Sequence, residues 1–225
     1  MANKQHFSPE LFKFLKELRS HNDRDWFAAN KHRYEVAVRD PFLQFIADFA
    51  PLLHGISPCF VSNPKPTGGS LFRIYRDTRF AEDKSPYKTH VAARFPHVDS
   101  SKDISSPGFY LHLEPRSCFA AAGVWHPDAP TLTKVRTAIV EHPKEWQAIR
   151  RSKLTVEGDM LMRPPRGFDP NHPFVEDLKL KDFVTTVSFT EKQVCSPRFI
   201  LDFTAACRKM SPLVRFLTTP LGLDW

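Results

Sequence analysis

The chain has 225 residues, a formal net charge of +7, and 41% hydrophobic and 25% charged residues, which is the ordinary composition of a soluble globular protein with a sizeable core. No apolar run approaches the ~20 residues that a membrane helix needs, and the N-terminus is too polar for a secretory signal. We therefore expect a cytoplasmic protein with reduced thiols and no membrane partner. The cysteines form no C-x-x-C pair, which argues against a zinc–thiolate or redox motif of that type; they are Cys59, Cys118, Cys195 and Cys207.

The first fifty residues predict a helical layer. Ser8 and Pro9 are a favoured N-cap and first helical residue, and apolar residues follow at helical spacing. A second helix is expected after Asn22 or Asp23, and Pro41 is expected to open a third.

The middle of the chain predicts antiparallel strands after a loop rich in proline and glycine. Residues 71–75 alternate, with Leu71, Arg73 and Tyr75 on one face and Phe72 and Ile74 on the other, so we expect a strand whose Phe72 and Ile74 pack on helices. Further strands are expected over 90–95 and 108–114. A short turn at 115–117 predicts a hairpin with 118–125.

The last hundred residues predict helices over 127–142 and 143–151, a proline-broken loop, a strand over 182–189, and a final helix opened by Ser196 and Pro197. Helices followed by adjacent strands and then helices again are typical of an α+β fold. We predict an antiparallel sheet flanked by helices, in a single domain over residues 1–225.

The stretch from Gly68 to His90 concentrates charge, with five Lys or Arg residues against three Asp or Glu residues. Five cations against three acids leave two cations in excess, and arginine suits phosphate or carboxylate because it donates parallel hydrogen bonds. The predicted ligand-binding residues are Arg73, Tyr75, Arg76, Asp77, Arg79, Lys84, Tyr87 and Lys88. A structural web of ion pairs explains the same residues equally well, so both interpretations stay open.

Tyr110, His112 and Glu114 share the polar face of the predicted strand 108–114, because they alternate with apolar residues. A histidine and a carboxylate beside arginines can perform general acid–base chemistry on a phosphorylated substrate, so His112 and Glu114 are the catalytic candidates. The alternative is a solvated sheet face. We predict no metal site, because no third ligand has a telling spacing from the His-x-Glu pair.

The preferred function is recognition of a phosphorylated or other anionic ligand, with a phosphoester-directed enzyme as one form of it. The alternative is a non-enzymatic nucleic-acid-binding module that uses the same stretch and a second basic segment, Lys144, Arg150, Arg151 and Lys153. A third interpretation is a structural or partner-binding protein whose arginines hold the fold together. The sequence identifies no cofactor, ligand or oligomeric state.

Several stretches resemble one family: "NDRDWFAANKHRYE", "GGSLFRIYRDTRFAEDKSPYKTH", "PGFYLHLEP", "GVWHPDAPTLTKVR" and "RPPRGFDPNHPFVEDLKLKDF". Together they are similar to the family called domain of unknown function 2461, over nearly the whole chain. The resemblance implies one domain. It carries no established activity or catalytic residue, so the candidates above rest on the residues themselves.

Overall fold

The computed structural model describes residues 4–79, 82–100, 103, 105–152 and 154–225. The predicted helical layer is present: α1 spans Pro9–Ser20, α2 spans Arg24–Tyr34 and α3 spans Asp40–His54. The Asp23 side chain caps α2 by accepting a hydrogen bond from the Trp26 N–H at 2.8 Å. Pro41 does not open a separate helix as predicted, because the π-helical turn Glu35–Arg39 joins α2 to α3 in helical conformation.

Within the described residues, four strands form one antiparallel sheet in the order β1-β2-β3-β4. They are β1 (Val91–Pro96), β2 (Gly108–Glu114), β3 (Ser117–Val124) and β4 (Phe183–Phe189), in four of the five regions where strands were expected. The α+β prediction is therefore confirmed.

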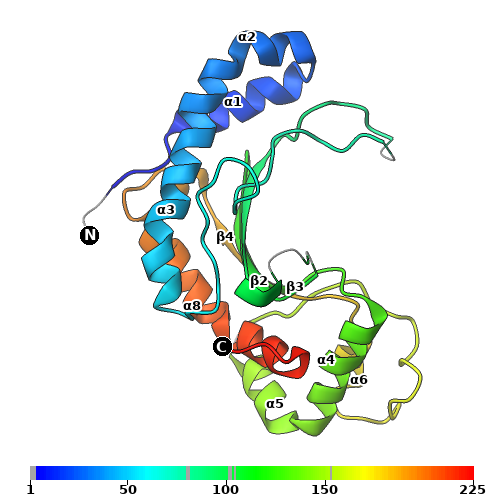
Figure 1. Cartoon of the computed structure of the whole chain (residues 1–225). Helices are drawn as coiled ribbons and strands as arrows, with labels where there is room; N and C mark the ends of the chain where they lie inside the picture. Colours follow the sequence, from blue (N-terminus) through cyan, green and yellow to red (C-terminus); the bar gives the residue numbers. More distant parts are fainter. Residues whose placement is uncertain (1–3, 80–81, 101–102, 104, 153) are drawn as a thin grey trace.

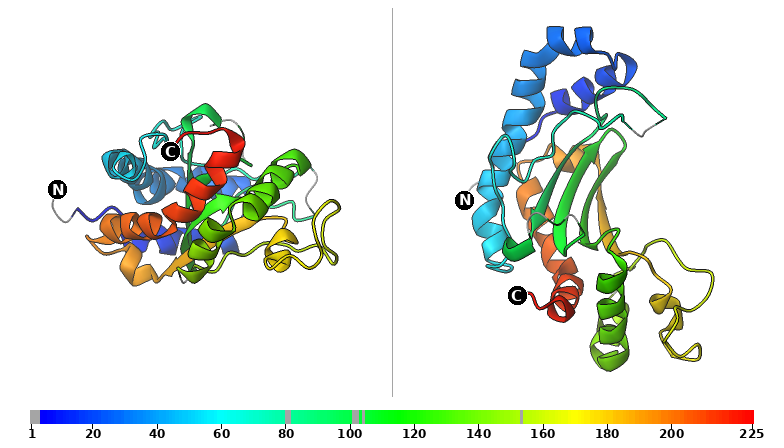
Figure 2. Two further views of the ribbon diagram at one scale, coloured as in Figure 1. Left: turned by 90° about the horizontal axis from the view of Figure 1, so that it is seen from below. Right: turned by 45° about the vertical axis from the view of Figure 1, so that its right-hand side comes forward.

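The two faces of the sheet have different surroundings. Phe109, Leu111 and Leu113 of β2 are fully buried and join the core with α1, α3 and α8 (Phe199–Thr218). These helices cover one face of the sheet, and the other face is open (Figures 1 and 2). Strand alternation thus sends the apolar residues of β2 to the helices and its polar residues to the open face.

Residues 71–75 do not form the predicted regular strand. The segment makes isolated bridges, Leu71 with Ala93 and Tyr75 with Tyr87. Leu71 and Ile74 are both buried in the core, whereas Phe72 is only partly buried, so the predicted alternation of faces is wrong. The physical reason is that the segment leaves the edge of β1 after its first residues, and alternation holds only along a continuous ladder.

Residues 75–79 and 82–87, called the arm below, extend beyond the strands on the open side (Figure 1). Backbone hydrogen bonds close the base of the arm, from the Arg76 N–H to the Pro86 carbonyl at 2.9 Å and from the Lys88 N–H to the Ile74 carbonyl at 2.8 Å. Gly68 and Gly69 belong to the turn before this segment: a side chain on Gly69 would meet the Lys65 carbonyl at 2.4 Å. The geometry of this turn therefore accounts for the glycine pair.

A second group of buried residues lies beneath the sheet in Figure 1, between α4 (Ala129–Glu141), α5 (Pro143–Arg151) and the end of α8. Trp146 is its largest fully buried side chain and donates to the Asp177 carboxylate at 2.9 Å. The short helices α6 (Val175–Leu178) and α7 (Glu191–Val194) were not predicted, and α8 begins at Phe199, two residues after Pro197. None of the helices in the described part of the chain combines the length and the apolar character needed to cross a bilayer.

We expect limited proteolysis to yield no two stable fragments, since α8 contributes Phe203 and Met210 to the first core and Leu213 and Leu217 to the second. Cutting the chain between the cores would expose apolar surface of one continuous helix. The measurement is trypsin digestion followed by mass spectrometry and circular dichroism of any resistant fragments. Two fragments that each unfold cooperatively would contradict the single-domain prediction.

Candidate functional site

A pocket of about 600 Å³ lies on the open face of the sheet. Its walls come mainly from the segments on either side of the arm and from β1, β2, β3 and β4. The aromatic residues in its lining are Phe72, Phe109, Tyr110, Phe119 and Trp125. Apart from Tyr110, the lining contains four titratable residues: Lys88, His90, Arg94 and His112. Its volume is in the range of pockets that bind small molecules.

A chain of hydrogen bonds runs along β2 at the edge of the pocket. The Tyr110 hydroxyl lies 3.0 Å from Nδ1 of His112, and Nε2 of His112 lies 3.4 Å from Oε2 of Glu114. His112 also stacks on Phe119 of the neighbouring strand, with ring centroids 4.7 Å apart. The prediction that Tyr110, His112 and Glu114 share one face is confirmed, although His112 is buried rather than solvated.

Glu114 is held from outside the pocket by two further residues. Its Oε1 accepts a hydrogen bond from Arg19 of α1 at 2.5 Å and another from the Thr89 hydroxyl at 3.1 Å. Burial raises the pKa of Glu114, but its hydrogen bonds with His112 and Thr89 outweigh burial and hold the pKa below its ordinary value. Oε2 is thereby left to face His112.

His90 is the member of this site that the sequence did not reveal. Its ring centroid lies 4.5 Å from that of His112, and ligand atoms of His90, His112 and Glu114 all lie within 4.8 Å of one another. Burial lowers the pKa of His90 to about 4 and also lowers the pKa of His112, so both rings are neutral at neutral pH. The signal was the strand register: Ala92 pairs with His112, so His90 lies diagonally opposite on the same face.

Lys88 and Arg94 bring positive charge into the pocket. The Lys88 ammonium lies 5.3 Å from the centre of the Phe72 ring. Arg94 is held in place by two backbone acceptors, since its Nη2 donates to the carbonyls of Asp103 and Ser106 at 2.7 and 2.9 Å. Arg94 was not among the predicted ligand-binding residues.

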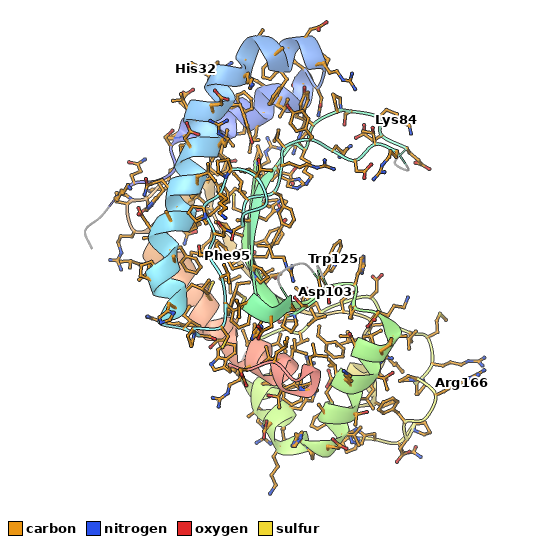
Figure 3. The ribbon with its side chains drawn as sticks, in the orientation of Figure 1. His32, Lys84, Phe95, Asp103, Trp125 and Arg166 are labelled. Carbon is orange, nitrogen blue, oxygen red and sulfur yellow. The ribbon has the colours of Figure 1, made fainter. Side chains whose placement is uncertain are left out.

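The charged residues of the arm that were predicted to bind a ligand are instead paired with other groups of the arm. Arg79 donates two side-chain hydrogen bonds to Asp77, at 2.7 and 3.0 Å, and Arg76 pairs with Asp83. Lys84 donates to the Thr78 carbonyl at 3.0 Å, and Figure 3 shows Lys84 on the arm, well away from Trp125. The structural web is thus present within the arm.

Apart from Lys88, the other predicted residues of the stretch lie outside the pocket lining. Tyr87 is buried and stacks on Phe27 at 4.0 Å, while Tyr75 is exposed beside it. Arg73 is exposed, and its charge helps to lower the pKa of Asp77, whose main cause is the hydrogen bond from Arg79. Among the described residues, Lys88 is the predicted ligand-binding residue that lines the pocket together with the predicted catalytic His112.

The second basic segment lies at the opposite end of the molecule from the arm, because α5 carries Lys144, Arg150 and Arg151 (Figure 1). Arg150 is 3.4 Å from the Asp177 carboxylate. Lys153 lies outside the described residues. The two basic segments therefore do not adjoin, and nucleic-acid binding stays a prediction.

Of the comparisons with known proteins, only the one with family models gives a match. No curated protein and no solved structure matches the chain. A family model described as a conserved hypothetical protein, DUF2461, matches residues 10–216, so this chain is a member of the DUF2461 family.

Proposed function

We propose that the pocket on the open face of the sheet binds a small molecule with an anionic group, a phosphate ester or a carboxylate, on an aromatic or apolar body. The observation that carries this proposal is the position of Lys88, a cation in an aromatic-lined pocket. The sequence-based expectation of an anionic ligand is thereby kept, but the binding position moves from the arm to the pocket.

The surroundings of Lys88 favour an anion. Burial lowers the pKa of Lys88, and the nearby charges of Arg73 and Arg76 lower it further. Among the described residues, no carboxylate lies within ion-pair distance of its ammonium. A partly buried cation beside two arginines is destabilised by desolvation and by repulsion, and a bound anion offsets both.

The remaining walls favour a flat or apolar body on the ligand. Phe72 and Phe119 are partly buried, and Trp125 is 57% exposed although it lines the pocket. An exposed tryptophan beside a pocket offers a large surface that a ligand can cover. The pocket thus combines an apolar surface with a few polar groups, which is typical of small-molecule sites.

We expect ligand-observed NMR to detect binding of members of a panel of aryl and alkyl phosphates and carboxylates, each paired with a neutral analogue of the same shape. The anionic compounds should bind and their neutral partners should not. Lys88→Met keeps the apolar stem and removes the charge, and it should weaken binding at least about tenfold, whereas Lys88→Arg should retain binding. The matched control is Arg79→Ala, which removes a cation of the arm and should bind as the wild type does.

Three results would contradict the proposal. If neutral analogues bind as tightly as the anions, or no member of the panel binds, the pocket is not an anion site. If Arg79→Ala abolishes binding and Lys88→Met does not, the ligand binds on the arm. Circular dichroism of each variant separates loss of binding from loss of folding.

A further inference from the structure

We propose that His90, His112 and Glu114 bind one divalent transition-metal ion of the zinc class at the edge of the pocket. Two imidazoles and one carboxylate are a ligand set that zinc uses when a fourth coordination position stays open. His90 directly precedes β1, and His112 and Glu114 lie on β2, so the pairing of β1 with β2 brings the three side chains together.

The distances fit a small coordination sphere. Ligand atoms placed 2.0–2.1 Å from a tetrahedral ion lie about 3.4 Å from one another. Nε2 of His112 and Oε2 of Glu114 are 3.4 Å apart, and the group as a whole lies within 4.8 Å. A modest movement of the His90 ring therefore completes the set.

The partners around the ligands orient them in the way that metal ligands are commonly oriented. Arg19 and Thr89 both hold Oε1 of Glu114, so Oε2 is presented to the proposed ion. The Tyr110 hydroxyl lies 3.0 Å from Nδ1 of His112, so Nε2 is presented in the same direction. Hydrogen bonds to the outer atoms of metal ligands fix their orientation and strengthen binding.

Binding of the ion by Nε2 changes which ring nitrogen of His112 carries the proton, but the ring stays neutral. Glu114 accepts only, so without metal Nε2 carries the proton and Nδ1 accepts from the Tyr110 hydroxyl. When Nε2 binds an ion, the proton resides on Nδ1, and the Tyr110 oxygen accepts it. Nδ1 of His112 thus keeps the Tyr110 oxygen as its partner in both states, as acceptor without the ion and as donor with it.

The open coordination position would face the pocket, since two of the three ligands, His90 and His112, line it. Lys88 lines the same space, so an anionic group could meet both the ion and the ammonium. This inference shares the pocket with the proposed function, but it depends on other side chains and can be tested without any organic ligand.

The test is titration of the metal-free protein with zinc chloride by isothermal titration calorimetry, and with cobalt chloride by visible absorption. The wild type should bind one equivalent of zinc, and cobalt should give the intense bands of a four- or five-coordinate ion. His90→Ala and Glu114→Gln should each weaken zinc binding at least about 100-fold. Arg19→Ala, which removes an orienting partner, should weaken it about tenfold.

Two control variants make the test specific. His54→Ala removes an exposed histidine at the end of α3 and should leave the zinc stoichiometry unchanged. Lys88→Met should retain zinc binding but no longer bind the anionic compounds. Failure of the zinc proposal can therefore be distinguished from failure of the anion proposal. Zinc bound equally by the wild type and His90→Ala, or cobalt spectra of a six-coordinate surface ion, would overturn the inference; the cobalt spectrum of the wild type decides even if a variant does not fold.

Discussion

Replacing Phe203 with alanine is expected to lower the free energy of unfolding by about 3–5 kcal/mol. Phe203 of α8 is fully buried, and its ring centroid lies 4.9 Å from that of Phe49 in α3 and 5.9 Å from that of Phe95 in β1. The ring thus joins the helical layer to the sheet, and its removal leaves a cavity that three elements cannot all close. The measurement is urea denaturation followed by circular dichroism.

Leu201→Ala is the matched control on the same helix. Leu201 is 46% exposed, so its truncation should change the free energy of unfolding by about 0.5 kcal/mol or less. If Phe203→Ala costs less than about 1 kcal/mol, the helices do not pack tightly on the sheet.

Replacing Gly123 with alanine is expected to cost about 3 kcal/mol or more, or to prevent folding. Gly123 of β3 has φ of +135°, a conformation that side chains rarely adopt, and an added Cβ would lie 1.9 Å from the Phe183 carbonyl oxygen. Gly123 pairs with Val184 of β4, so the clash would push the two strands apart. Thermal and urea unfolding measure the loss.

Gly167→Ala separates the effect of the clash from that of the backbone conformation. Gly167 also has a positive φ, of +87°, but an added Cβ would meet no atom within 4 Å. Its substitution should cost only about 1–2 kcal/mol, the strain of the backbone alone. Equal losses at both positions would show that strand contact at Gly123 contributes nothing.

Sequence reasoning succeeded where structure depends on neighbours along the chain. The alternation of Phe109, Leu111 and Leu113 with Tyr110 and His112 correctly assigned both faces of β2, because a strand turns successive side chains to opposite sides. The Asp23 cap of α2 could be predicted for a similar reason, since an N-cap side chain accepts hydrogen bonds only from N–H groups in the first turn of its own helix. The same reasoning was wrong for Leu71–Tyr75, where pairing with β1 is interrupted.

Only part of the candidate site could be predicted from the sequence. His112 and Glu114 are two residues apart on one strand, so their shared face followed from the sequence alone. His90 joins them through the pairing of β1 with β2, and that register is a long-range property.

The sequence by itself determined the α+β class, the strands of the sheet and the excess of positive charge between Gly68 and His90. Only the tertiary structure decided where that charge goes. It pairs Arg76 and Arg79 with acids inside the arm and leaves Lys88 in an aromatic pocket. The physical reason is that a count of charges carries no distances, and the strength of each interaction depends on distance and burial.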